Sequence, residues 1–181
     1  MEKKKILAIL IILILTIGLL TLTGCADSKY DDSSNTNKTS SEEKKKESLE
    51  ANVDDLTISL NYSGSFNGIS YKYPSKATTS NIGTYSIMDY MNGSEFIFRV
   101  AMYYFENKTL NQAMEGSSTT SKGTKIINGK EWNVYEGKSQ DGKNLINYAY
   151  QHNSDTYTIT FIYDKDISNF IDVFMNTVNF K

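Results

Sequence analysis

Apolar and polar side chains alternate over long stretches of residues 51–181, and this pattern constrains the fold more than any other feature of the sequence. The clearest stretch has apolar side chains at every second position: Phe96, Phe98, Val100, Met102 and Tyr104. Another carries Tyr157, Ile159, Phe161 and Tyr163 on one face, with Thr156, Thr158 and Thr160 on the opposite face. Successive side chains of a β-strand point to opposite faces of a sheet, so the alternation predicts strands with one face against a core.

Turn signals separate these stretches. Asn92-Gly93, Asn128-Gly129 and Asp141-Gly142 each lie between two strand-like runs, and both Gly and Asn tolerate the positive φ of tight hairpins. The predicted hairpins pair 83–91 with 94–105, 123–127 with 130–137, 131–138 with 144–152, and the run before Asn153-Ser154-Asp155 with 156–163. A further strand, Ile69–Tyr73, is expected to end at Pro74, which has no amide hydrogen for a ladder.

Two stretches show helical spacing instead. Residues 109–114 predict a short helix with Thr109 as its N-cap. Near the end of the sequence one apolar stripe is formed by Ile167, Phe170, Ile171, Phe174 and Val178, with Asp166 as the expected N-cap. Runs of strands, each run followed by a helix, predict an α+β fold: an antiparallel sheet of about six to eight strands with the short helix and the C-terminal helix packed on it.

Three stretches of this region resemble PsbP-like domains. They are F-N-G-I-S-Y-K-Y-P-S at 66–75, I-I-N-G-K-E-W-N-V-Y at 126–135, and I-S-N-F-I-D-V-F-M-N-T-V-N-F at 167–180. The resemblance implies a PsbP-like α+β domain with an accessory or binding role. Members of that family share a scaffold and not an active site, so the resemblance carries no functional residue to this chain.

The first 25 residues have the layout of a secretory signal: Lys3-Lys4-Lys5, the apolar run Ile6–Leu22, then small residues. Leu22-Thr23-Gly24-Cys25 resembles the bacterial lipobox, in which an aliphatic residue and two small residues precede a cysteine. The resemblance implies transfer of diacylglyceryl to the Cys25 sulfur and signal cleavage between Gly24 and Cys25. Two acyl chains anchor a protein stably in a membrane, whereas one chain does not.

Composition and the N-terminal pattern together divide the chain into three parts. Residues 1–24 are expected to be a lipoprotein signal peptide, residues 25–50 a disordered tether poor in apolar side chains, and residues 51–181 the folded domain. The alternative for the apolar run is an uncleaved signal anchor, because its length is at the short end for a membrane span. Either alternative places the domain on the extracytoplasmic face of the cell membrane.

Charge and cysteine content exclude several classes of function. The chain has 19 basic and 21 acidic residues, and no stripe of Lys and Arg appears in the domain, so a nucleic-acid partner is not expected. One cysteine allows no internal disulfide. The expected partners are the membrane, through diacylglyceryl on Cys25, and an unidentified envelope protein or glycan.

Two constellations imitate functional sites. His152, the single histidine, lies three residues before Asp155, but a catalytic triad also needs a positioned nucleophile, so a surface hairpin histidine is expected. Asp164, Asp166 and Ser168 imitate the start of a calcium loop, but Asn169 and Met175 stand where that loop needs Gly and Glu. We therefore predict no catalytic residue, no metal site and no cofactor.

The 13 tyrosines have two explanations. Tyrosine gives contact area with a polar tip, which suits the binding of sugars, peptides or proteins, but it also favours strands. The sequence thus predicts a lipid-anchored lipoprotein with a non-catalytic binding or accessory domain. The alternatives are a cell-surface hydrolase with an unidentified acidic pair and an interaction subunit of an envelope complex.

The lipobox generates the first testable prediction. Cys25→Ala removes the thiol that would receive the diacylglyceryl group, so the variant should accumulate as a precursor without lipid label. Metabolic labelling with a fatty acid, followed by electrophoresis, measures both effects. Normal labelling of Cys25→Ala would exclude the lipoprotein assignment.

Overall fold

A computed structural model describes residues 49–181. The lipobox residues Leu22, Thr23, Gly24 and Cys25, the signal peptide and most of the expected tether lie outside the described residues. The described elements are β1 (Leu49–Val53), β2 (Leu56–Leu60), β3 (Tyr62–Phe66), β4 (Ile69–Tyr73), β5 (Thr78–Ile82), β6 (Tyr85–Asn92), β7 (Glu95–Phe105), α2 (Leu110–Met114), β8 (Thr119–Ile127), β9 (Lys130–Lys138), β10 (Asn144–His152), β11 (Asp155–Tyr163), α3 (Ser168–Met175) and β12 (Asn179–Phe180).

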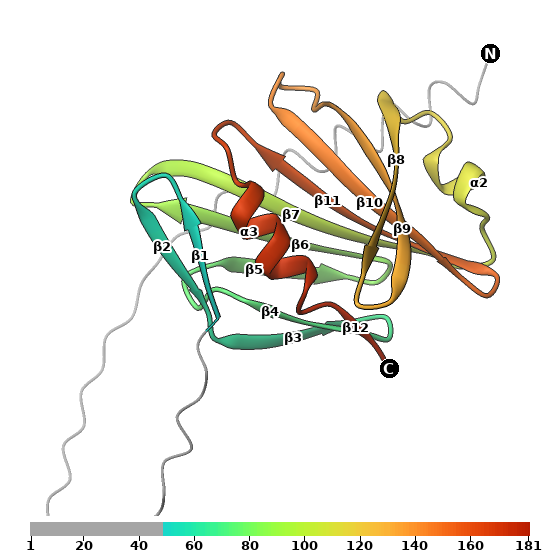
Figure 1. The fold of residues 1–181 in the computed structure, drawn as a ribbon, viewed down its shortest axis with the longest axis horizontal. Helices are drawn as coiled ribbons and strands as arrows, with labels where there is room; N and C mark the ends of the chain where they lie inside the picture. The colour runs from blue at the N-terminus through green and yellow to red at the C-terminus, as the bar shows by residue number, and fades with distance from the viewer. Residues whose placement is uncertain (1–48) are drawn as a thin grey trace, which may run out of the picture. The chain divides into compact units, whose positions relative to one another are not determined.

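The strands form three antiparallel sheets (Figure 1). The large sheet has seven strands in the order β5-β6-β7-β11-β10-β9-β8, and the small sheets have the orders β12-β4-β3 and β1-β2. The fold is mostly antiparallel sheet with two short helices, which is broadly α+β. Between Leu49 and Lys181 neither helix has the length and apolar character that a membrane crossing requires.

All four predicted hairpins are confirmed, and so is the end of β4 before Pro74. The β1–β2 hairpin was not predicted. Strand β1 already includes Leu49 and Glu50, which we expected to belong to the tether. The hairpin turns at Asp54-Asp55, where Asp54 takes a φ of 49° without an adjacent glycine, so the sequence signal for the turn is weak.

One face of the large sheet, here called the core face, is covered by α3 (Figure 1). The alternation in β7 and β11 directs their apolar side chains to this face, where Phe98, Val100, Ile159 and Phe161 are buried completely. Phe170 and Phe174 of α3 are also completely buried. The ring centroids of Phe98 and Phe170 lie 4.0 Å apart, and Phe161 meets Phe174 edge-on at 5.6 Å. The core therefore forms where α3 meets the centre of the sheet.

The two helix N-termini differ in how well the sequence predicted them. Thr109 caps α2 as expected, and the Gln112 side chain bonds back to Thr109 to complete a capping box. For α3 the predicted N-cap Asp166 is wrong by one residue, because Ile167 occupies that position. Asp166 still accepts a hydrogen bond from the Ser168 amide at 2.9 Å. Its carboxylate thus pairs with one of the backbone amides that have no partner within the helix, from the residue before the N-cap.

The segment after α3 is held by polar side chains from other elements. Asn128, in the β8–β9 turn, donates from Nδ2 to the carbonyl oxygens of Asn176 and Val178, both at 3.0 Å. Thr177 Oγ1 accepts from the Lys72 amide of β4 at 2.9 Å. Helix α3 ends at Met175, so Val178 lies beyond it, although the predicted apolar stripe included this residue. Val178 is nevertheless buried.

The opposite face of the large sheet, here called the outer face, is only partly open. Thr156, Thr158 and Thr160 lie on it as predicted, yet all three are buried. The segment 106–118, which contains α2, covers them, and the Thr156 hydroxyl donates to the Lys108 carbonyl at 2.7 Å. The covering segment turns what would be a solvent-facing sheet surface into a second, polar interior.

The aromatic contact between α3 and the sheet generates the second prediction. Phe170→Ala removes a fully buried ring that packs on Phe98, so it should lower the free energy of unfolding by about 3–5 kcal/mol. Denaturant titration measures the change. Phe105→Ala, at the half-buried end of β7, is the matched control and should cost clearly less. Equal losses in the two variants would contradict the assignment of the core.

Candidate functional site

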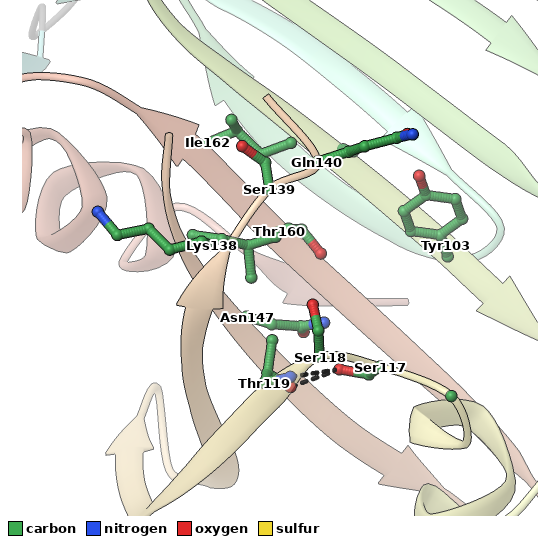
Figure 2. Close-up of a pocket in the computed structure, with 13 residues that line it drawn as sticks. Tyr103, Ser117, Ser118, Thr119, Lys138, Ser139, Gln140, Asn147, Thr160 and Ile162 are labelled. Carbon is green, nitrogen blue, oxygen red and sulfur yellow. Dashed lines mark hydrogen bonds between the residues drawn. The ribbon is translucent and has the colours of Figure 1, made fainter. Parts of the chain in front are cut away.

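A pocket of about 390 Å³ opens on the outer face of the large sheet (Figure 2). Its floor comes from the sheet, and its wall comes from two connecting segments. The lining residues are Ala101 and Tyr103 of β7, Gly116–Thr119 at the start of β8, Lys138–Gln140 at the end of β9, Leu145 and Asn147 of β10, and Thr160 and Ile162 of β11. The volume falls in the range of small-molecule sites, which is about 300–1,000 Å³.

Two glycines shape the wall of this pocket. Gly116 has a φ of 78°, which turns the chain from α2 into the wall. Gly137 of β9 faces the wall from the other side, and a Cβ atom there would lie 2.9 Å from the Ser118 carbonyl oxygen. The absence of that atom lets the wall approach β9 closely. Within the wall, the Ser117 and Thr119 hydroxyls bond to each other.

Hydroxyl and amide groups dominate the lining. Hydroxyls come from Tyr103, Ser117, Ser118, Thr119, Ser139 and Thr160, and amides from Gln140 and Asn147. The thirteen lining residues include no carboxylate, imidazole or thiol (Figure 2). Lys138 brings the one cationic side chain of the lining, and its Nζ donates to Asn144 Oδ1 at 2.7 Å. The pocket therefore offers both polar and apolar contacts, and its lining carries one positive charge, on Lys138.

Tyr103 forms the aromatic side of the pocket. It is 38% exposed, and its ring stacks between Tyr85 and Phe105 at centroid distances of 6.1 and 6.2 Å. Burial raises the pKa of the Tyr103 phenol, and nearby Arg99 opposes that change. The phenol therefore stays protonated at neutral pH, as a neutral donor and acceptor.

The tyrosines as a group do not form a binding surface. Tyr71, Tyr90, Tyr148 and Tyr157 are buried in the core. Among the tyrosines of residues 49–181, Tyr103 alone lines the pocket. Core packing thus accounts for these four tyrosines, and Tyr103 is the one that contributes to the pocket lining.

Asn147 links the floor of the pocket to α2. Its Nδ2 donates to the Met114 sulfur at 3.8 Å, while its buried Oδ1 has no hydrogen-bond partner among the described residues. The Asn147 amide group therefore connects the floor of the pocket to the covering segment.

His152 and Asp155 lie at the two ends of the β10–β11 turn, and no hydrogen bond between their side chains is present among residues 49–181. Asp155 accepts from the Tyr104 hydroxyl and from the Asn107 amide, each at 2.8 Å. The His152 ring stacks near Tyr150 and lies 5.8 Å from the Phe180 ring. The turn is thus a structural junction between the sheet and the segment that leads to α2.

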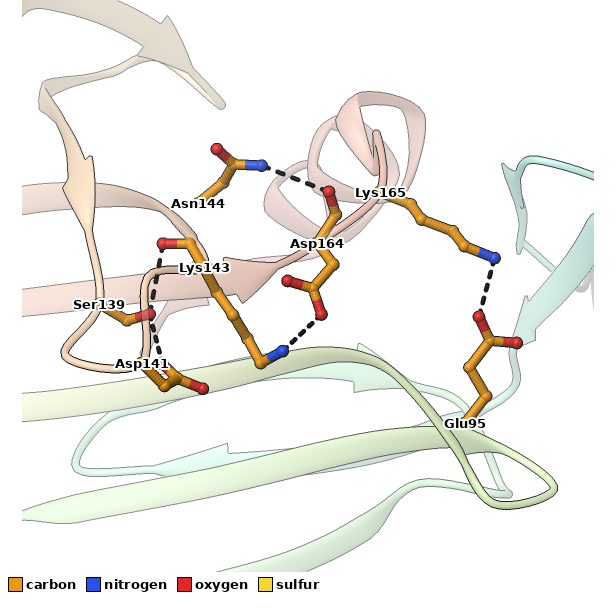
Figure 3. A network of polar contacts seen from close by, with 7 residues as sticks. All are labelled: Glu95, Ser139, Asp141, Lys143, Asn144, Asp164 and Lys165. Atoms are coloured by element: carbon orange, nitrogen blue, oxygen red, sulfur yellow. Dashed lines mark hydrogen bonds and ion pairs between the residues drawn. The ribbon is translucent and has the colours of Figure 1, made fainter.

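The residues that imitate a calcium loop are engaged in other contacts. Asp164 pairs with Lys143 across the sheet end, and Asn144 donates to the Asp164 carbonyl at 3.4 Å (Figure 3). Asp166 bonds to the start of α3. Over residues 49–181 no group of three or more His, Cys, Asp or Glu side chains is arranged to hold a metal ion.

A pair of carboxylates, which a glycoside hydrolase needs, meets at Lys165. The Lys165 Nζ lies 2.8 Å from Glu95 Oε1 (Figure 3). The same Nζ lies 3.7 Å from Asp54 Oδ2. All three side chains are about half exposed. A catalytic acid of a hydrolase is kept protonated by a secluded site, whereas these carboxylates face water and share one ammonium group. The pair is a surface ion network.

The pocket was not predicted from the sequence, because its parts are far apart in the chain. Ser117, Ser118 and Thr119 belong to a run of small polar residues that is typical of any loop. The outward-facing threonines of β11 were visible in the alternation, but the sequence did not show that a segment covers them. The Gly-Ser-Ser-Thr-Thr-Ser run at 116–121 is the one signal that could have indicated a hydroxyl-lined wall.

Two solved structures are similar to this chain at low sequence identity. No protein-family model matches the sequence, and no curated protein matches it. A crystal structure from Bacteroides thetaiotaomicron is similar with a TM-score of 0.43 and 15% identity, over 63% of this chain and 45% of that chain. The solution structure of cyanobacterial PsbP (CyanoP) from Synechocystis is similar with a TM-score of 0.45 and 13% identity, over 66% of this chain and 91% of that chain. This chain thus spans less than half the length of the Bacteroides protein.

The bond between Tyr104 and Asp155 generates the third prediction. It raises the pKa of Tyr104 from 10.0 to about 12, so its contribution to stability is complete below pH 10 and is lost as the pH rises through about 12. Wild type should therefore be more stable than Tyr104→Phe at pH 9, and the difference should shrink towards pH 12. Urea titrations across this range measure it. Asp155→Asn should shrink the difference at pH 9 as well. A difference that stays constant from pH 9 to pH 12 would contradict the role of this bond.

Proposed function

We propose that this chain is a lipoprotein anchored to the extracytoplasmic face of the cell membrane, and that its domain binds a small, uncharged, polar ligand of the envelope without catalysing a reaction. The observation that carries the binding part is the composition of the outer-face pocket. It combines six hydroxyl-bearing side chains with one aromatic ring and no carboxylate, imidazole or thiol. Such a lining offers hydrogen bonds and apolar contact, which are the means of recognition.

The absence of carboxylate, imidazole and thiol groups from the pocket lining supports binding rather than catalysis. Hydrolysis and group transfer need a positioned nucleophile, acid or base. Lys138 is held by Asn144, and the Ser139 hydroxyl donates to Asp141 Oδ1 at 2.6 Å (Figure 3). That bond lowers the pKa of Asp141, whose carboxylate is not part of the pocket lining. The serine is thus bonded as a donor and not activated as a nucleophile.

A neutral saccharide has the chemistry that the pocket complements. Ala101, Leu145 and Ile162 give the floor apolar contact, and the wall of Ser117, Ser118 and Thr119 supplies hydroxyl groups. Sugars present both apolar C–H groups and hydroxyls, and Tyr103 brings an aromatic ring and a phenol hydroxyl to the pocket lining. The Lys138 ammonium group is bonded to Asn144, which lies outside the lining, so the hydroxyl and amide groups supply the other polar contacts.

The anchor and the PsbP-like character of the domain rest on the sequence. Leu22-Thr23-Gly24-Cys25 after an apolar run supports diacylglyceryl attachment at Cys25. The three PsbP-like stretches support an accessory role. The second of these stretches belongs to the β8–β9 hairpin, and the third comprises α3 and β12. A membrane anchor would hold the pocket close to envelope glycans.

The fourth prediction tests the pocket. N,N′-diacetylchitobiose and maltose serve as neutral disaccharide probes, and NMR chemical-shift mapping measures binding. We expect shifts at Tyr103, Thr119 and Leu145, and an affinity about tenfold lower in Tyr103→Ala, which corresponds to about 1.4 kcal/mol. Tyr62→Ala is the matched control, because Tyr62 is 53% exposed and lies outside the pocket lining. Unchanged affinity in Tyr103→Ala, or shifts confined to other surfaces, would exclude the pocket as the binding site.

A further inference from the structure

Strand β5 is an edge of the large sheet that no described element covers. It pairs with β6 and with no other strand between residues 49 and 181. All five of its residues are exposed, and Ile82 is exposed to 55%. An edge strand presents unpaired backbone N–H and C=O groups, which can pair with a strand of another chain.

The hydrogen-bond pattern of the neighbouring strands shows which groups point outward. The Tyr104 amide donates to the Thr84 carbonyl at 2.9 Å, so the even-numbered residues of β6 face β7. The odd-numbered residues of β6 therefore face β5, where they pair with Ile82, Ser80 and Thr78. The backbone groups of Thr79 and Asn81 consequently point away from the sheet.

Other strand edges carry features that hinder pairing. Strand β8, at the opposite edge of the large sheet, has a register shift between Ser121 and Gly123 and carries Lys122 and Lys125. Strand β3 contains Gly64, which weakens a strand. Bulges and lysines are common means of protecting edges. Strand β5, with the sequence T-T-S-N-I, has no charged residue, proline, glycine or register shift.

We propose that the β5 edge is a self-association surface, on which a second copy of this chain pairs antiparallel about a two-fold axis through Ser80. In this register Thr79 of each copy faces Asn81 of the other, so the residues with outward-pointing groups meet one another. Every outward N–H and C=O group of both copies is then paired. The large sheets of the two copies join into one continuous sheet.

A second copy fits this edge better than an arbitrary peptide because the strand is complementary to itself. A two-fold axis requires the same patch on both subunits. The outward-facing positions, Thr79 and Asn81, are spaced symmetrically about Ser80, and shifting the register by one residue would oppose outward groups with inward ones. No charge on the strand opposes a like charge across the axis. This surface is separate from the pocket, so the inference stands independently of the proposed ligand.

The fifth prediction tests the pairing by disulfide trapping in the membrane-bound full chain. In the proposed register Ser80 meets Ser80 of the second copy as a non-hydrogen-bonded pair, with Cα atoms about 4.5 Å apart, within the range of a disulfide. Under mild oxidation Ser80→Cys should form a disulfide-linked dimer at least tenfold faster than Ser121→Cys. Ser121 is the matched control, because it is exposed on the bulged edge of the same sheet. Wild type, with Cys25 alone, gives the background.

A second substitution separates strand pairing from chance collision. Thr79→Pro removes an outward N–H but leaves the bonds to β6 in place, so in the Ser80→Cys chain it should abolish fast cross-linking. Thr79→Val keeps the N–H and should preserve it, and near-UV circular dichroism verifies the fold of both. The proposal is overturned if Ser80→Cys cross-links no faster than Ser121→Cys, or if Thr79→Pro leaves the rate unchanged. A trapped product whose mass is not twice that of the chain would also overturn it.

Discussion

The packing of α3 on the centre of the large sheet is the interaction on which the rest of the structure depends. Phe170 and Phe174 lie between the large sheet and the small sheets, and both are fully buried. Asn169 of the same helix accepts from the Asn52 amide of β1 at 2.7 Å, so one short helix joins the large sheet to the β1–β2 hairpin. A domain with so little helix therefore relies on that helix to close its apolar core.

The outer face shows what happens when a sheet is covered by a polar segment instead of an apolar helix. The segment 106–118 is bonded to β11 through the Thr156 hydroxyl, which donates to the Lys108 carbonyl, and α2 adds no buried residue of its own. Such a cover fits less tightly than an apolar one, and a polar pocket remains beside it. The pocket and the apolar core thus lie on opposite faces of one sheet.

Local sequence signals predicted most helices and strands, but they did not predict contacts between residues that are far apart in the chain. Asn128-Gly129 predicted a hairpin because the turn chemistry is contained in two residues. The sequence did not show that the Asn128 side chain also bonds to the chain after α3, because that contact joins residues far apart. Likewise, Thr109 predicted the start of α2 because an N-cap is a local signal. The pocket, in contrast, forms only where five segments that are far apart in the chain come together. Strand β5 was missed because T-T-S-N-I is exposed on all sides and has no apolar alternation.

The place of α3 in the chain has a consequence for synthesis. All seven strands of the large sheet precede it, so the ribosome completes the sheet before it makes the cover of the core face. A chain interrupted before Ser168 would present Phe98, Val100 and Phe161 to water, and such a surface attracts chaperones and proteases. The apolar core therefore becomes inaccessible to chaperones and proteases only in molecules that have been translated through α3.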